Sequence, residues 1–241
     1  MKHLLVLLIT LILFGNVKGQ KIELSISLNS GLYSFAGFAS ASSAILETSP
    51  QTNTNLTSNA WGTRSRPAYG VSFNLRKVTR MNYFYGVDMG YEMLRSSMNI
   101  TSINEYILNS TGTISSVNTY NSTGRSYLNN SFINFNPFVG YRFTLREISL
   151  DLSAGLDIGY CLQSIAKGKA VKSDGTTYNS EYDNYAQIKW DIRPRIHLLT
   201  SYKKVGVYVG YSYGVTNYIP SSPFVTESRL FRFGVTYLLK H

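Results

Sequence analysis

The chain of 241 residues has little cysteine and little charge. Its one cysteine, Cys161, excludes any internal disulfide. Only 15% of its residues are charged, whereas roughly a quarter are charged in an average soluble domain. Aromatic residues, in contrast, make up 14% of the chain. This balance is unusual for a soluble domain.

Motifs of the common enzyme classes are also absent. The sequence has no Gly-rich phosphate loop and no zinc-ligand spacing. Beyond the N-terminal segment, only His197 and His241 could supply an imidazole. We therefore expect no enzyme activity, no catalytic residues, no cofactor and no metal site.

Apolar runs long enough for a transmembrane helix are absent after residue 20, as is any helical period. The N-terminus is different, because a basic start at Lys2 is followed by an apolar run over 4–14 and by small residues at 15–19. This order is typical of a secretory signal peptide, and a retained anchor helix is the alternative. We predict a signal peptide at residues 1–19 and one exported domain at 20–241.

Strict alternation of apolar and polar residues recurs along the exported part, and this is the period of a β-strand with two different faces. In the segment 83–93, for example, Tyr85, Val87 and Met89 alternate with glycine and carboxylate residues. Eight segments follow the pattern, at 21–28, 67–75, 83–93, 132–145, 148–162, 186–198, 205–215 and 230–239. We therefore predict eight strands.

The connections between these segments alternate between long and short. The long ones are rich in Ser, Thr and Asn and lie at 38–66, 96–131, 166–183 and 216–227. The short ones lie at 76–82, 146–147 and 200–204. An even number of strands, short turns at one end and long loops at the other are typical of a transmembrane β-barrel. Closure leaves no strand edge unpaired in lipid.

The predicted fold class is thus all-β, an eight-stranded antiparallel up-and-down transmembrane β-barrel with long outer loops and short periplasmic turns. A soluble lipocalin-like barrel is the alternative, and it would place the apolar faces inward. Aromatic-rich apolar faces, polar faces rich in Gly and Ser, and segments often longer than the 9–11 residues that a spanning strand needs favour the membrane barrel.

The polar faces carry charges of both signs, and the clearest case is KWDIRPRIHL at 189–198. An eight-stranded barrel has an interior only wide enough for side chains, and charges buried there need partners. We predict an interior charge cluster of Asp88, Glu92, Arg142, Asp151, Asp157, Lys189, Asp191, Arg193, Arg195 and Arg232. A structural ion-pair plug is the preferred interpretation, and an ion or solute path is the alternative.

Single residues within the strands allow sharper expectations. A two-residue turn at Arg146 and Glu147 would set Arg142 opposite Asp151, although this residue pair is not a favoured turn. Pro137 and Pro194 each remove a ladder hydrogen bond, so we expect a local bulge at each. His197 and Cys161 are predicted to point into the bore, with His197 near the short-turn end and so far from the outer loops.

The Gly-alternating strands YGVDMGYEM and VGVYVGYSYGV and the closing LFRFGVTYLL resemble those of small outer-membrane barrels of the OmpA/OmpX architecture. Within that group, the chain is similar to the PorT-like outer membrane beta-barrel domain proteins of Gram-negative bacteria. The resemblance implies an outer-membrane location, and the PorT likeness implies a role in protein secretion.

The leading function hypothesis is a non-enzymatic, envelope-structural or surface-binding scaffold that acts through its long outer loops. The alternatives are a narrow porin-like channel and the PorT-like secretion role, with a soluble carrier as a remote fourth. The expected partners are outer-membrane lipid and an extracellular ligand or other envelope proteins, and we expect a monomer. The net charge of +10 forms no basic stripe, so it favours an anionic membrane surface over nucleic acid.

Overall fold

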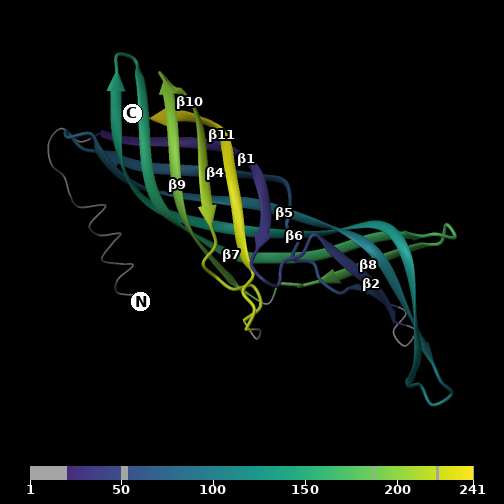
Figure 1. Ribbon diagram of the computed structural model, residues 1–241. Coiled ribbons are helices and arrows are strands. Elements are labelled where there is room, and N and C mark those ends of the chain that lie inside the picture. The colour runs from purple at the N-terminus through teal and green to yellow at the C-terminus, as the bar shows by residue number, and fades with distance from the viewer. Residues whose placement is uncertain (1–20, 50–53, 187, 221–222, 241) are drawn as a thin grey trace.

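The computed structural model describes residues 21–49, 54–186, 188–220 and 223–240. The predicted signal peptide, residues 1–19, lies outside the described residues. The strands are β1 (Lys21–Ala36), β2 (Ser43–Ser49), β3 (Thr54–Thr57), β4 (Arg64–Val78), β5 (Tyr83–Leu108), β6 (Ile114–Leu145), β7 (Ile148–Lys172), β8 (Thr177–Asp183), β9 (Trp190–Tyr202), β10 (Val205–Tyr213) and β11 (Glu227–Lys240) (Figure 1). In the part of the chain that the structure describes, no helix is long and apolar enough to cross a membrane.

Eight of these strands close into a ring of hydrogen-bonded antiparallel neighbours, in the order β1, β4, β5, β6, β7, β9, β10 and β11. The ring closes because β11 pairs with β1, from Leu24 opposite Lys240 to Ala36 opposite Glu227. Each of these strands contains most or all of one predicted segment, although β9 begins only at Trp190 and β10 ends at Tyr213. The predicted fold class, an antiparallel up-and-down barrel, is confirmed.

Short turns connect the barrel strands at one end, at the upper left of Figure 1. Leu145 pairs with Ile148, so Arg146 and Glu147 form the predicted two-residue turn. The register places Arg142 opposite Asp151, as predicted. The turn forms despite its unfavourable sequence, because Arg146 adopts a left-handed φ of 55°.

The prolines do not behave as predicted. The pairing of β7 with β9 runs through Pro194 without a register shift. The pairing of β9 with β10 stops at Arg195, one residue before it would reach Pro194. Pairing of β6 with β7 lapses at Pro137 but resumes in the same register. The expected bulges at these two prolines are therefore wrong. Pro194 lies just past the end of the β9–β10 ladder and Pro137 lies in a short gap of the β6–β7 ladder, so neither missing N–H group has to be accommodated by an additional residue in the strand. A register shift does occur around Pro67, between Ser65 and Tyr69 of β4.

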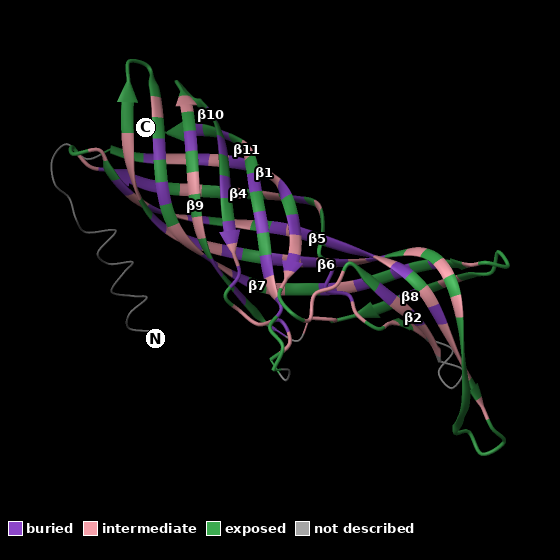
Figure 2. Ribbon diagram, viewed as in Figure 1, coloured by how far each residue is buried: buried purple, intermediate pink, exposed green. Residues whose placement is uncertain are grey.

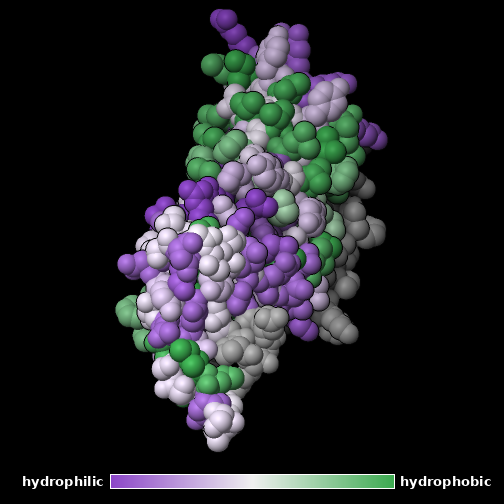
Figure 3. All heavy atoms as spheres, turned by 90° about the vertical axis from the view of Figure 1, so that its right-hand side faces the viewer, coloured by the Kyte–Doolittle hydropathy of each residue, from purple (hydrophilic) through white to green (hydrophobic). Residues whose placement is uncertain are grey.

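The two faces of the barrel have opposite chemistry. Buried and exposed residues alternate along each barrel strand (Figure 2). The exposed face is apolar and includes Leu28, Tyr69, Phe73, Met89, Val139, Leu152, Ile196, Val207, Phe233 and Tyr237. Hydrophobic side chains cover the upper, barrel part of the face shown in Figure 3, and hydrophilic ones predominate below it. An apolar exterior around a polar interior is the reverse of a lipocalin and suits a barrel set in lipid.

The outer connections are not the loops that the sequence predicts. The predicted loop at 96–131 is mostly strand, because β5 and β6 continue as a hairpin far beyond the barrel. The strand β2 pairs in parallel with the outer part of β5, and β3 pairs with β2. On the other side, β8 folds back on the outer part of β7. These segments form one outer extension of the barrel wall, at the lower right of Figure 1.

The outer extension has its own core and is almost a second closed sheet. Its buried side chains are Leu46, Ile100, Ile103 and Ala170. Its two edge strands, β3 and β8, share no ladder but are bridged by side chains. The amide of Asn55 donates to the carbonyl oxygen of Asn179 at 2.9 Å, and the hydroxyls of Thr57 and Ser180 lie 2.9 Å apart.

Candidate functional site

An ion-pair quartet lies in the bore close to the short turns. Arg142 is bound by two carboxylates, with its Nε 2.7 Å from Asp151 Oδ1 and its Nη1 2.9 Å from Glu23 Oε1. Arg76 joins the same two acids, at 2.7 Å from each. Two guanidinium groups and two carboxylates thus neutralise one another. Such charge-assisted pairs satisfy most of the hydrogen-bonding capacity of buried charges.

Two members of this quartet were not among the predicted interior charges. Glu23 lies on β1 and Arg76 at the end of β4, where the sequence suggests that a turn begins. Glu23 alternates with Ile22 and Leu24, which was the available signal, and Arg76 continues the polar positions of its strand after Leu75. Arg76 also donates to Asp151 of β7, on another part of the ring, so only the closed barrel shows this contact.

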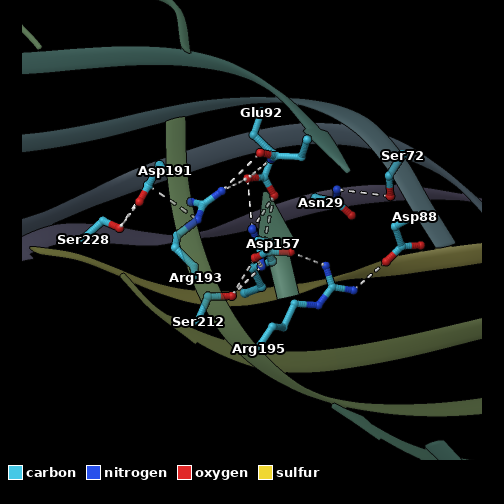
Figure 4. A network of polar contacts seen from close by, with 12 residues as sticks. Asn29, Ser72, Asp88, Glu92, Asp157, Asp191, Arg193, Arg195, Ser212 and Ser228 are labelled. Atoms are coloured by element: carbon cyan, nitrogen blue, oxygen red, sulfur yellow. Dashed lines mark hydrogen bonds and ion pairs between the residues drawn. The ribbon is translucent and has the colours of Figure 1, made fainter. Parts of the chain in front are cut away.

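A second network fills the middle of the bore (Figure 4). It centres on Arg232 of β11. Its Nε and Nη2 donate to the two carboxylate oxygens of Glu92 at 2.8 and 3.0 Å. Its Nη1 donates to Asp157 Oδ2 at 2.5 Å and to the hydroxyl of Ser212 at 2.6 Å. One arginine therefore ties β11 to β5, β7 and β10.

Strand β9 contributes the other two arginines. Arg195 reaches Asp88 at 2.6 Å and Asp157 at 3.2 Å. Arg193 is fully buried and lies 3.3 Å from Glu92 and 3.6 Å from Asp191. The structure thus brings the predicted interior charges together in two networks, and Lys189 is the exception.

Lys189 is exposed, so its predicted interior position is wrong. Strand β9 begins at Trp190, and the alternation therefore does not extend back to Lys189. Ile188, which the same alternation would place in lipid, is buried in the barrel mouth instead. His197 does lie in the bore, where its ring packs 4.6 Å from that of Tyr208.

An apolar plug closes the outer mouth of the barrel. Trp61 and Tyr218, from two outer connections, fold inward onto Phe35, with ring centroids 5.0 and 4.8 Å from it. The cluster is completed by Tyr33, Ala60, Ala68, Leu94, Leu128, Phe132, Ala166, Ile188 and Leu230. Tyr218 also donates a 2.5 Å hydrogen bond to Asp191, which links this plug to the charge network below it.

The described bore is therefore filled rather than open. Between the quartet and the central network, the cavity that the structure leaves measures about 40 Å³, which is room for a few water molecules. The apolar plug lies above this cavity. Packing of this kind is what an eight-stranded barrel allows.

A larger pocket of about 510 Å³ lies on the outer side, beyond the plug. Its walls come from β3 and β8, and its floor from residues of the mouth. Its lining consists of Ala39, Asn55, Leu56, Thr57, Ser58, Asn59, Trp61, Ala166, Ser180, Tyr182, Asn184, Tyr185 and Ile219. Burial raises the pKa of Tyr185, and the hydrogen bond from the backbone N–H of Ala60 lowers it. The effect of burial is the larger, so the pKa is raised. This tyrosine therefore stays neutral and can serve as a hydrogen-bonding group.

The lining has the composition of a binding pocket. Aromatic side chains lie beside amides and hydroxyls, and the volume is in the range of small-ligand sites. The described lining holds no carboxylate, imidazole, thiol or amine. No group of three or more His, Cys, Asp or Glu side chains within the described ranges is placed to hold a metal ion.

A closed eight-stranded ring with an apolar exterior and a charged interior defines a transmembrane β-barrel of the bacterial outer membrane. No family model and no curated protein matches the chain. The finer resemblance to PorT-like proteins therefore has no support.

Among solved structures, the chain is similar to Neisserial surface protein A, with 11% identity, 89% of this chain and 96% of that chain covered, and a TM-score of 0.37. It is similar to Ail of Yersinia pestis in complex with the heparin analogue sucrose octasulfate, with 11% identity, 92% and 100% covered, and a TM-score of 0.35. For the outer membrane protease OmpT of Escherichia coli the values are 12% identity, 91% and 96% covered, and 0.35. The class of this protein rests on its own geometry.

Proposed function

We propose that the protein is a non-enzymatic surface receptor, in which a closed barrel anchors a ligand-binding extension on the outer face of the cell. The observation that carries the proposal is the 510 Å³ pocket at the base of the extension. The bore beneath it is filled by the ion pairs and the apolar plug, which argues against the porin-like channel.

The pocket chemistry supports binding rather than catalysis. General acid–base and nucleophilic catalysis need a titratable or nucleophilic group close to the substrate. The described lining offers amides, hydroxyls and aromatic rings. His197 lies in the bore, below the plug. Half-exposed Tyr182, with its ring 6.1 Å from that of Tyr185, gives a ligand an aromatic surface for stacking.

Packing and hydrogen bonds within the extension support the shape of this pocket. Its core is apolar, and Glu105 accepts hydrogen bonds from Tyr178 at 2.5 Å and from Lys172 at 3.2 Å. A binding surface on paired strands is better preorganised than one on free loops. The partners we propose are therefore an extracellular ligand in the pocket and outer-membrane lipid around the barrel.

The test is binding of intact cells that display the protein to arrays of defined oligosaccharides and short peptides. We expect binding above that of cells without the protein, and its loss in Tyr182→Ala. The matched control is Asn109→Ala, at the far tip of the β5–β6 hairpin. Equal binding by the wild type and Tyr182→Ala, or no binding above background, would contradict the proposal.

A further inference from the structure

The end of the barrel that carries the short turns has an excess of positive charge. Among the described residues, its turns and strand ends expose six cations and one carboxylate, Glu147. The six are Lys21, Arg80, Arg146, Lys203, Lys204 and Lys240. Hydrophilic side chains at the top of Figure 3 mark this end. An exposed cluster of one sign attracts ligands of the other sign.

A pocket of about 230 Å³ opens into the bore at this end. Its floor is the ion-pair quartet, so the guanidinium groups of Arg76 and Arg142 lie at its base. Its edge carries Lys21, Lys203 and Lys204. The pocket thus combines ion-paired guanidinium groups below with exposed amines above, and both kinds of group bind phosphate in proteins.

Lys203 and Lys204 occupy their turn against local preference. Tyr202 pairs directly with Val205, so the two lysines form the whole turn. Lys203 adopts a φ of 52°, a conformation that residues other than glycine seldom adopt. No ion pair joins either lysine to a carboxylate within the described ranges.

The charge balance of the pocket indicates what kind of anion it takes. The floor is neutral, because Arg76 and Arg142 are paired with Glu23 and Asp151. At the edge, three amines stand against one carboxylate, Glu147, and Lys21 also lies 3.8 Å from Glu23 of the floor. The edge therefore has a surplus of two positive charges, and a phosphate monoester carries about −1.5 to −2 at neutral pH.

We propose that this inner pocket binds a phosphate group, held by Lys203 and Lys204 above the quartet. The group comes either from the headgroup of a phospholipid or from a soluble phosphate compound in the periplasm. The two sources share one chemistry, and the experiment separates them. The site is independent of the receptor pocket at the opposite end of the barrel.

The experiment uses the full barrel in neutral detergent at about 0.15 M sodium chloride, so that weak surface attraction is screened. Inorganic phosphate is titrated and followed by calorimetry, and phosphatidic acid is titrated in parallel and followed by native mass spectrometry. We expect saturable binding of one phosphate group, weakened about tenfold or more in Lys203→Ala/Lys204→Ala, because two charge-assisted contacts are lost.

The matched control is Arg80→Ala/Lys240→Ala, which removes the same charge from the same end but does not line the pocket. It should bind phosphate as the wild type does, and a heat-dependent shift in gel mobility shows that each variant is folded. Tighter binding of phosphatidic acid than of inorganic phosphate assigns the site to lipid, and equal binding assigns it to a soluble ligand. Equal loss in the two double variants, or no saturable binding, overturns the proposal.

Discussion

Replacing Arg232 by methionine tests whether the central network is a dry structural plug. Arg232 is 3% exposed, and its four hydrogen bonds to Glu92, Asp157 and Ser212 are between 2.5 and 3.0 Å. Methionine keeps much of the side-chain length but removes the charge. Glu92 and Asp157 then stay buried with weaker partners, at 3.3 Å from Arg193 and 3.2 Å from Arg195.

Removing one side of a buried ion pair costs about 3–5 kcal/mol, so we expect a loss of this size in Arg232→Met. The assay is urea unfolding of the barrel in lipid vesicles, followed by tryptophan fluorescence. The control is Arg229→Met, an exposed arginine on the same strand that lies over the ring of Tyr213. Its change should be within about 0.5 kcal/mol.

Replacing Glu92 and Asp157 by the corresponding amides should restore the stability that Arg232→Met loses. The triple variant Arg232→Met/Glu92→Gln/Asp157→Asn removes both uncompensated charges, and we expect it to regain most of the lost stability. If Arg232→Met alone costs less than about 1 kcal/mol, the network behaves as a solvated surface pair. The reasoning that the bore is filled would then be refuted.

The remaining predictions concern one turn and the outer extension. Arg146→Gly should raise the free energy of unfolding by about 0.5 kcal/mol. A left-handed conformation costs a residue other than glycine about 1–2 kcal/mol, and the greater chain entropy of unfolded glycine offsets about 0.5–1 kcal/mol of that gain. A lower urea midpoint would contradict this prediction. In the extension, the hydrogen bond that Tyr178 donates to Glu105 raises the pKa of Tyr178. Because the folded pKa is the higher one, this stabilisation is complete below the ordinary tyrosine pKa of about 10 and is lost as pH rises through the raised value. Proteolysis of the extension should therefore increase above about pH 10 more steeply in the wild type than in Tyr178→Phe, and identical profiles would contradict the assignment.

The eight barrel strands were predictable because each has one face in lipid and one in a polar bore. In β4 and β10, this forces an apolar residue at every second position, from Tyr69 to Leu75 and from Val205 to Tyr211. The pairing of Arg142 with Asp151 was predictable because a two-residue turn fixes the register of its hairpin.

The outer extension was not fully predictable, because the far part of its β5–β6 hairpin lacks two different environments. Residues 114–119 of β6 are exposed on both faces, so no apolar period marks them, and their Ser, Thr and Asn content suggested a loop. The extension also depends on the pairing of β2 with β5, which joins segments more than 50 residues apart. Sequence periodicity carries no information about such pairings.

Some contacts in the bore networks and the make-up of the outer pocket could not be predicted from the sequence, for a related reason. Contacts across the bore, such as the one between Arg76 and Asp151, join strands that are not neighbours in the ring. The outer pocket combines segments near 55–61, 180–185 and 219. These residues come together only when the barrel closes and the extension folds. Turn lengths and alternation in the sequence do not indicate such contacts.

The measurement that tests the central claim most directly is ion conductance of the wild-type protein in planar lipid bilayers. A bore filled by two ion-pair networks and an apolar plug predicts insertion of folded protein without conductance steps. Insertion is checked independently by protease protection of the membrane-spanning strands. Reproducible conductance steps that change in Arg195→Ala, inside the bore, would show an open path and contradict the account.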